Sequence, residues 1–597
     1  MAPLFTSGKA AVVTIACTFA LAACQHEGEL KLSGDARATP ESATAAYDNV
    51  SKRDAARAKK YMVAAANPLA AQAGLEILRA GGSAVDAAIA TQLALNVVEP
   101  QSSGIGGGAF LMHYAATSRE IEAYDGREKA PKRSTPDMFL NHDGSKRKFH
   151  DTVPGGQSVG VPGLLSMLEL AHKKHGKLPW EKLFDPAINL AKNGFEVSPR
   201  LNKLITTDRH LRKFFDTIDL FFGKDGKPLQ VGARLVNKPL ADTFRTIAKG
   251  GARAFYTGEI ARDIVRAVRK SLINPGRMEV SDLRDYEAKK RIPICSFYRM
   301  WLVCGMPPPT SGGVTTLQIL GLLHGVDLVK LEPGSAEAVH LIAEASRLAF
   351  ADRNTYLADA DFVSVPTNGL IDPGYLAKRA KAISPDKSMG KATPGDPGGK
   401  TAHLFGPARG HEGVSTSHIS IVDGNGNAVS MTSSIENMFG SRLMVRGFLL
   451  NNQLTDFSFL PIVKGKAVAN SVQGGKRPRS SMSPFLVTDG SGKLVLAVGS
   501  PGGSRIIGYV AKTLIAMLDW KMNIQAAIDL PHFVNRNGVT DLEKGSALAV
   551  LKAPLEALGH KVRLADLTSG LHGIAIGKDG ILTGGADPRR EGVAIGD

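Results

Sequence analysis

The sequence contains few cysteines, and they do not follow a metal-binding pattern. Among 597 residues there are only 4, Cys17, Cys24, Cys295 and Cys304, and no two of them form a C-x-x-C pair. No spaced cluster of histidines and cysteines accompanies them, which argues against a structural zinc site. We therefore expect neither a metal nor a cofactor.

Long apolar runs are missing beyond the N-terminus. No later segment is apolar over the length needed to span a bilayer. Hydrophobic residues make up 43% of the chain and charged residues 22%, a balance typical of a soluble globular protein. At this length we expect a soluble body with a core larger than that of one small domain.

Clustered positive charge is also missing, although the net charge is +17. Lysine and arginine are scattered, with only short groups at 56–60 and 146–148. Nucleic-acid binding requires basic residues gathered on a recognisable module. We therefore expect no nucleic-acid partner, and we interpret the charge as a basic surface that faces anionic membranes or solutes.

The N-terminus has the organisation of an export signal. Lys9 precedes a short apolar run that ends at Cys24, and a polar stretch follows. This order is typical of a signal peptide, and Leu21 to Cys24 resembles the lipobox of bacterial lipoproteins. We predict a signal peptide over 1–23, a lipidated Cys24 and a polar tether over 24–58, giving an exported, periplasmic protein attached to the membrane through its lipid only. A plain signal peptide, in which Cys24 has no role, is the alternative.

Helix signals dominate the first two-thirds of the body. Residues 67–100 predict two helices separated by Gly81-Gly82, with Ser83 as the N-cap of the second. Further helices are predicted at 162–174 and 336–353. Cysteines 295 and 304 flank two predicted strands, where an oxidising compartment would permit a disulfide, and the sequence leaves that pairing open.

A β-hairpin follows a loose segment rich in glycine, proline and lysine at 384–413. Pairing Ile419 with Met431 and Ile421 with Val429 keeps the apolar residues on one face. The same register closes the hairpin over Asp423 to Asn427, whose composition suits a turn.

This register places Thr416 opposite Ser434, and His418 opposite Thr432, on the other face. A threonine that begins a strand behind a loose loop suits an N-terminal nucleophile, because its freed α-amine can serve as the base. The hydroxyls of Ser434 and Thr432 could orient it. The alternative is a row of hydroxyls that solvent or backbone groups satisfy.

Several motifs carry a family resemblance from about Met62 to the C-terminus: "GGSAVDAAIATQLALNVVEPQSSGIGGGAF", "MPPPTSGG", "TSHISIVDGNGNAVS", "LLNNQLTDFS", "KRPRSSMSP", "VGSPGGSRII" and "GGADPRREG". The chain resembles the γ-glutamyltransferases (glutathione hydrolases), members of the N-terminal nucleophile hydrolase superfamily. The resemblance implies an α+β fold, a four-layer αββα sandwich of two antiparallel sheets, built from two autoprocessed fragments of one chain.

The resemblance also implies self-cleavage. Thr416 attacks the carbonyl of Ser415, which yields a large subunit (59–415) and a small catalytic subunit (416–597) that form a heterodimer. Thr416 then attacks the γ-glutamyl amide of glutathione or its conjugates. Water, or the amine of an amino acid or peptide, resolves the resulting γ-glutamyl-enzyme.

The remaining site residues are carried over by position. A glutamyl donor needs a cation for its α-carboxylate and acceptors for its α-ammonium, and an arginine suits the carboxylate because it can pair bidentately. Backbone N–H groups of a glycine pair suit an oxyanion. The resemblance implies Arg127, Ser480 and Ser481 for the carboxylate, Glu436, Gln453 and Asp456 for the ammonium, and Gly502 and Gly503 for the oxyanion hole.

The chain departs from the family pattern in two places. Residue 417 is serine where many relatives have a second threonine, and the stretch between Asp456 and Lys476 lacks an obvious lid tyrosine, which leaves donor occlusion and acceptor choice open.

One alternative function is a cephalosporin or glutaryl acylase of the same superfamily, which Asp456 argues against because a glutaryl group has no ammonium. Another is an inert peptide-binding lipoprotein, which an intact Thr416 argues against.

Overall fold

The computed structural model describes residues 53–398, 405–407, 410, 413 and 415–597. The predicted signal peptide, the lipidation site Cys24 and nearly all of the predicted tether lie outside the described residues. Among the residues that are described, no helix combines the length and hydropathy that a membrane crossing requires.

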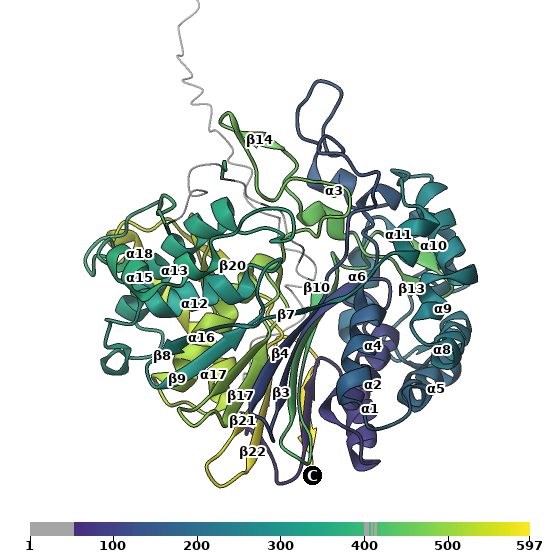
Figure 1. The fold of residues 1–597 in the computed structure, drawn as a ribbon, viewed down its shortest axis with the longest axis horizontal. Helices are drawn as coiled ribbons and strands as arrows, with labels where there is room; N and C mark the ends of the chain where they lie inside the picture. Colours follow the sequence, from purple (N-terminus) through teal and green to yellow (C-terminus); the bar gives the residue numbers. More distant parts are fainter. Residues whose placement is uncertain (1–52, 399–404, 408–409, 411–412, 414) are drawn as a thin grey trace, which may run out of the picture. The chain divides into compact units, whose positions relative to one another are not determined.

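Two seven-stranded antiparallel sheets form the centre of the fold (Figure 1). We name each after one strand. The β10 sheet has the order β23 (Val593–Gly596), β2 (Met62–Ala65), β10 (Ser415–Val422), β11 (Ala428–Glu436), β3 (Gly108–Ala115), β4 (Glu120–Gly126), β7 (Lys289–Arg291). The β17 sheet has the order β1 (Ala56–Ala58), β22 (Leu582–Ala586), β21 (His572–Ile576), β17 (Leu494–Gly499), β16 (Phe485–Thr488), β9 (Trp301–Gly305), β8 (Ile294–Tyr298).

Helices cover the outer face of each sheet (Figure 1). The β10 sheet is covered by a group that includes α1 (Pro68–Arg79), α2 (Ala84–Val98) and α4 (Leu164–His175). The β17 sheet is covered by a group that includes α12 (Gly312–Leu322), α13 (Ala336–Tyr356), α16 (Ile506–Leu518) and α17 (Ile524–Asp529). The predicted αββα sandwich is confirmed, and both sheets contain strands from each side of residue 415.

The described chain contains further α-helices and strands. The other helices are α3 (Phe149–Thr152), α5 (Asp185–Asn193), α6 (Pro199–Thr207), α7 (Phe215–Phe221), α8 (Lys238–Gly250), α9 (Arg253–Tyr256), α10 (Gly258–Arg269), α11 (Val280–Arg284), α14 (Thr367–Leu370), α15 (Pro373–Ala380) and α18 (Lys552–Ala557). The other strands are β5 (Phe195–Glu196), β6 (Arg234–Leu235), β12 (Met444–Val445), β13 (Phe448–Leu449), β14 (Ile462–Val463), β15 (Lys466–Ala467), β18 (Phe533–Asn535), β19 (Thr540–Glu543) and β20 (Val562–Ala565).

Local sequence signals explain the helices next to the site. The side chain of Ser83 accepts from the N–H of Asp86, and the Asp86 carboxylate accepts from the N–H of Ser83, a reciprocal cap that starts α2. Every residue of α2 is buried, because α1 covers one side of it and the β10 sheet the other. The two predicted helices and their cap are confirmed.

The last residues of the predicted tether (24–58) belong to the fold. Ala56–Ala58 form strand β1 and pair with β22 at the edge of the β17 sheet. Three residues are too few to show a strand alternation, so only the tertiary pairing reveals this strand. At the other edge of the sheet, Cys295 and Cys304 are cross-strand neighbours on β8 and β9 and form a disulfide.

Candidate active site

The hydroxyl face of the β10–β11 hairpin is buried against the β17 sheet. The predicted pairs Ile419–Met431 and Ile421–Val429 are present, and these apolar residues pack on the helix side. On the opposite face, Ser430 donates to the carbonyl of Val498 (3.1 Å). The hydroxyls of this face therefore lie between the two sheets and not in solvent.

The ladder is interrupted at Thr416. Ser415 pairs with Glu436 and Ser417 with Ser433, so Thr416 alone lies opposite two residues, Ser434 and Ile435, and the extra residue is on the β11 side. The predicted direct pairing of Thr416 with Ser434 is only partly right: counting by two from Ile419 assumes an uninterrupted ladder, and in the bulge Thr416 lies opposite both Ser434 and Ile435. The bulge nevertheless brings the side chains together: Thr416 Oγ1 lies 3.0 Å from Ser434 Oγ.

Two hydroxyls converge on one carbonyl at this bulge. Thr416 Oγ1 lies 2.7 Å from the carbonyl oxygen of Ser415, and Ser434 Oγ lies 3.0 Å from the same oxygen. On the other side of Thr416, Arg590 donates from Nη1 to the Thr416 carbonyl (2.8 Å). Thr416 is only 3% exposed, so its hydroxyl is held in a dry, hydrogen-bonded position.

Thr432 has a different partner. It pairs with His418 as predicted, and its hydroxyl is 2.8 Å from His418 Nδ1. The other ring nitrogen of His418 is 3.1 Å from Ser420 Oγ. Burial holds the pKa of His418 well below its usual value, so the ring is neutral. Thr432 thus orients His418, and Ser434 is the hydroxyl that meets Thr416.

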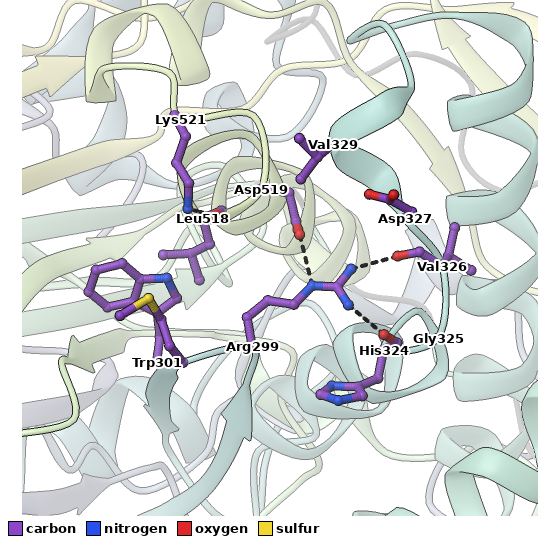
Figure 2. Close-up of a pocket in the computed structure, with 11 residues that line it drawn as sticks. Arg299, Trp301, His324, Gly325, Val326, Asp327, Val329, Leu518, Asp519 and Lys521 are labelled. Carbon is purple, nitrogen blue, oxygen red and sulfur yellow. Dashed lines mark hydrogen bonds and ion pairs between the residues drawn. The ribbon is translucent and has the colours of Figure 1, made fainter.

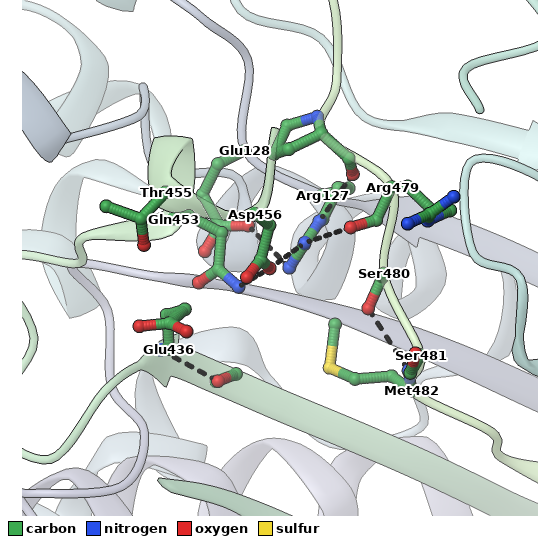
Figure 3. A network of polar contacts seen from close by, with 12 residues as sticks. Arg127, Glu128, Glu436, Gln453, Thr455, Asp456, Arg479, Ser480, Ser481 and Met482 are labelled. Atoms are coloured by element: carbon green, nitrogen blue, oxygen red, sulfur yellow. Dashed lines mark hydrogen bonds and ion pairs between the residues drawn. The ribbon is translucent and has the colours of Figure 1, made fainter. Parts of the chain in front are cut away.

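Arg127 is the centre of a second group of predicted site residues (Figure 3). Its Nη2 lies 2.5 Å from Asp456 Oδ2, and its Nε donates to the carbonyl of Pro478 (3.1 Å). Gln453 donates from Nε2 to the same Asp456 oxygen (3.0 Å). Arg127 follows the end of β4, whereas Gln453 and Asp456 belong to a short 3-10 helix, η7 (Gln453–Asp456).

Ser480 and Ser481 lie beside this group, on the segment that follows Pro478 (Figure 3). Ser480 Oγ accepts from the N–H of Met482 (3.1 Å). Ser481 Oγ accepts from Arg353 Nη2 (2.6 Å), which α13 supplies. Both serines are buried, and they are held by backbone and arginine donors, not by solvent.

Glu436 links the two groups. It ends β11 with a φ of 81°, a strained value for a residue with a side chain. Its N–H donates to Ser434 Oγ (2.8 Å), and its carboxylate accepts from the N–H of Gly413 and from Asn452 Nδ2. One residue therefore contacts the hydroxyl beside Thr416 and places a carboxylate on the Gln453 side of the Arg127 group (Figure 3).

Gly502 and Gly503 begin the helical segment that leads into α16. Gly502 has a φ of 133° and Gly503 a φ of 60°, conformations that favour glycine. A Cβ on Gly502 would lie 2.7 Å from the Tyr509 ring. The first N–H groups of a helical segment have no intrahelical acceptor and are well placed to receive an anion.

The glycine turn is joined to Thr416 through packed neighbours. A Cβ on Gly570 would lie 2.6 Å from Pro501 and 2.8 Å from the side chain of Arg590. Pro501 directly precedes the glycine pair, and Arg590 binds the Thr416 carbonyl. Pro501, which precedes the predicted oxyanion donors, and Arg590, which binds the Thr416 carbonyl, thus pack against the same glycine, Gly570.

Comparison with known proteins decides the family. Residues 70–597 match the gamma-glutamyltranspeptidase family. The chain belongs to this family.

Individual members are similar over almost their whole length. The glutathione hydrolase proenzyme of Bacillus subtilis (strain 168) is 37% identical over 580 residues, which cover 95% of this chain and 96% of that protein. The glutathione hydrolase proenzyme of Escherichia coli (strain K12) is 39% identical over 545 residues, which cover 89% of this chain and 91% of that protein. The crystal structure of a cephalosporin acylase from Bacillus halodurans superposes with a TM-score of 0.81 at 29% identity, covering 92% of this chain and 98% of that one.

One ionisable residue beside Arg127 was not predicted from the sequence. Glu128 lies 3.5 Å from Arg127, and neither side chain is exposed. Burial raises the pKa of Glu128 to about 8, although Arg127 opposes the shift. Its position directly after Arg127 was the available signal, but adjacency alone does not distinguish a buried acid from a surface one.

Two clusters elsewhere have the composition of metal ligands, His113–Glu122–His175 and His340–Glu344–His560. In the first, Glu122 already accepts from Lys174 and Lys290, so a metal would have to displace two ammonium groups. In the second, the two imidazoles bond to each other at 2.7 Å, and Arg347 bonds to Glu344. None of the predicted site residues of the gamma-glutamyltranspeptidase belongs to either cluster.

A surface pocket of about 410 Å³ lies at the β8–β9 turn (Figure 2). The guanidinium of Arg299 extends into it and binds Asp519 (2.9 Å) and the carbonyl of Val326 (2.7 Å). None of the predicted site residues lines this pocket. The charge of Arg299 is already matched by Asp519, so we assign no chemistry of this gamma-glutamyltranspeptidase to the pocket.

Proposed function

We propose that the chain is a self-processing γ-glutamyltransferase and glutathione hydrolase whose nucleophile is Thr416. The observation that carries this proposal is the convergence of the Thr416 and Ser434 hydroxyls on the carbonyl of Ser415. Family membership supports it, as do relatives that are named glutathione hydrolase proenzymes.

Self-cleavage follows from this geometry in two steps. Thr416 Oγ1 attacks the carbonyl carbon of Ser415, and the hydroxyl of Ser434 donates to the oxygen that becomes negative. The bond to the Thr416 nitrogen breaks, that nitrogen takes up the proton that Oγ1 loses in the attack, and an ester to Thr416 Oγ1 remains. Water hydrolyses the ester and leaves a large subunit ending at Ser415 and a small subunit beginning at Thr416. The freed α-amine then serves as the base of the mature enzyme.

The Arg127 group has the charges that a γ-glutamyl donor requires. Arg127, with Ser480 and Ser481, would bind the α-carboxylate, and Asp456, with Gln453 and Glu436, would bind the α-ammonium. Arg127 and Asp456 form a buried ion pair at 2.5 Å and neutralise each other. An α-amino acid group carries one charge of each sign, so it can bind to both residues without leaving either buried charge unmatched.

Turnover uses the glycine turn. Thr416 attacks the γ-carbonyl of the donor, and the N–H groups of Gly502 and Gly503 would stabilise the tetrahedral oxygen. The leaving amine takes a proton from the protonated α-amine of Thr416. Water or an acceptor amine then attacks the γ-glutamyl ester and regenerates the hydroxyl.

The similarity to the structure of a cephalosporin acylase is an observation in favour of the acylase alternative. A glutaryl group has no ammonium and would therefore offer no cation of its own to the acceptors Asp456 and Glu436. We therefore expect hydrolysis of a γ-glutamyl anilide to exceed that of the matched glutaryl anilide by at least tenfold. The reverse preference would support an acylase.

The proposed nucleophile is tested by substitution of Thr416. Thr416→Ala removes the oxygen that receives the Ser415 acyl group, so the chain should remain uncut and inactive. Thr416→Ser keeps the oxygen but loses the methyl group that restrains χ1, so it should cut slowly. Denaturing electrophoresis with N-terminal sequencing of the small band measures both. A wild-type fragment that starts at another residue would contradict the assignment.

We further propose that the chain is exported and anchored through Cys24, on the pattern of Leu21 to Cys24 alone. Cys24→Ala should move the protein from the membrane fraction to the soluble periplasmic fraction, and Cys17→Ala is the matched control that should not. Unchanged membrane partitioning of Cys24→Ala would refute the anchor.

A further inference from the structure

The residues on both sides of Thr416 are bonded to one segment of the chain, 99–102, which follows the C-terminus of α2. Ser417 donates from Oγ to Glu99 Oε2 (3.0 Å). Ser415 donates from Oγ to the carbonyl of Gln101 (2.8 Å). Because side chains alternate along a strand, these two serines leave the strand on the face opposite to Thr416.

The same segment also holds the partner strand. The N–H of Ile435 donates to the carbonyl of Ser102 (3.2 Å), and the N–H of Phe439 donates to the carbonyl of Gln101 (3.0 Å). The 99–102 segment therefore contacts both strands where the bulge interrupts their direct pairing. Its contacts with the side chains of Ser415 and Ser417 lie on the side of β10 away from the reacting hydroxyl.

An ion pair fixes this segment. Arg200, in the first turn of α6, donates from Nη1 to Glu99 Oε1 (2.6 Å), and both side chains are 1% exposed. Its Nη2 lies 3.4 Å from Ser102 Oγ, which in turn is 3.4 Å from Ser415 Oγ. Burial raises the pKa of Glu99, and the charges of Arg200 and Arg590 oppose that shift. The guanidinium of Arg200 therefore lies beside Glu99, which binds Ser417, and beside Ser102, which neighbours Ser415.

We propose that Glu99 and Arg200 are positioning residues for self-cleavage, acting through Ser417 and Ser415 to hold the bulge with Thr416 directed at the Ser415 carbonyl. The inference rests on the proposed function. Among the hydrogen bonds of the described residues, those of Glu99 and Arg200 do not involve the reacting atoms. After cleavage the Glu99–Ser417 contact remains and continues to orient Thr416, whereas Ser415 becomes the end of the other subunit.

Three variants of the full-length chain test the proposal. Glu99→Gln keeps the size of the side chain and removes the charge that pairs with Arg200. Ser417→Ala removes the hydroxyl that binds Glu99, and Ser417→Thr retains a hydroxyl. The matched control is Asp208→Asn. It disrupts another buried ion pair, that of Asp208 with Arg442 at 2.6 Å. Among the described hydrogen bonds, this pair makes no contact with Ser415 or Ser417.

Cleavage is followed by pulse-chase and denaturing electrophoresis, and the thermal unfolding midpoint of each variant is measured in a Thr416→Ala background that stays uncut. We expect Glu99→Gln and Ser417→Ala to slow cleavage by about ten- to hundredfold, the size of a lost charge-assisted hydrogen bond. Ser417→Thr should cut within about threefold of wild type, on the same scale. Asp208→Asn should cut at the wild-type rate, with an unfolding midpoint lowered at least as much as that of Glu99→Gln.

Three outcomes would overturn the inference: Glu99→Gln or Ser417→Ala cutting at the wild-type rate, Ser417→Thr cutting as slowly as Ser417→Ala, or Asp208→Asn slowing cleavage equally. If Glu99→Gln does not fold, the comparison of alanine with threonine at residue 417 decides the question. A wild-type chain that is not cut after Ser415 would refute the proposed function itself, so the two failures are distinguishable.

Discussion

The hydroxyl oxygen of Ser434 lies 3.0 Å from that of Thr416, although a bulge removes the direct strand pairing of the two residues. The same Ser434 oxygen is 3.0 Å from the Ser415 carbonyl and accepts from the N–H of Glu436. Ser434 is therefore restrained on two sides, and its contacts do not depend on the strand register alone.

Removal of the Ser434 hydroxyl should slow both reactions of Thr416. We expect Ser434→Ala to lower the rates of self-cleavage and of anilide hydrolysis by at least tenfold, since one hydrogen bond to a developing charge contributes about 1.5–3 kcal/mol. Thr432→Ala is the control on the same strand face, and it should cut at nearly the wild-type rate but lose stability, because it leaves His418 Nδ1 without its partner. Equal effects of the two variants on cleavage would contradict the different roles assigned to Ser434 and Thr432.

Arg127 should control donor affinity and leave cleavage intact. We expect Arg127→Ala to reduce kcat/KM for a γ-glutamyl anilide by about ten- to hundredfold, mainly through KM. Arg127→Lys should recover only part of the loss, because an ammonium cannot reproduce the fork of a guanidinium. The fraction cut, from electrophoresis, serves as the internal control. A wild-type KM for Arg127→Ala would remove this residue from the donor site.

Gly502 should be intolerant of a side chain. In Gly502→Ala the Cβ would meet the Tyr509 ring at 2.7 Å, so the turn must shift and carry its N–H groups with it. We expect kcat to fall by at least tenfold, since loss of one oxyanion donor alone reduces kcat by about 10²–10³. Gly580→Ala is the matched control: its φ is 80° and nothing lies within 4 Å of its Cβ position. Full activity of Gly502→Ala would exclude this turn from the oxyanion hole.

Glu128 should make the stability of the uncut chain depend on pH. Its pKa is about 8 in the fold and about 4.3 in an unfolded chain, so between these values the folded state holds one proton more. Stability should fall as pH rises through this window, by at most about 1.4 kcal/mol per pH unit, and should level off above about pH 8. Glu128→Gln should remove this pH dependence of the free energy of unfolding. The measurement is urea unfolding of the uncut Thr416→Ala protein, with and without Glu128→Gln, at pH 5, 6.5 and 8. An unchanged slope would show that Glu128 is ionised in the fold.

Local patterns were sufficient for the elements around the site. The alternation from Ile419 to Val429 and the turn from Asp423 to Asn427 set the hairpin register, because neighbouring strands joined by a tight turn have few alternative pairings. Ser83 and Asp86 set the start of α2 through a cap that spans three residues. Each signal acts over a short stretch of chain, and for this reason it could be read without the fold.

The tertiary structure decided how the site is assembled. The ion pair between Arg127 and Asp456 and the Arg200–Glu99 contact with Ser417 join segments separated by about a hundred residues or more. The bulge at Thr416 lies within the hairpin, but the segment that contacts its flanking serines is equally distant in the chain. Local alternation and capping contain no information about such contacts, which form only when packing of the two sheets and their helices brings the segments together. The sequence determined the hairpin and its row of hydroxyls, and the packing decided that Ser434, and not Thr432, meets Thr416.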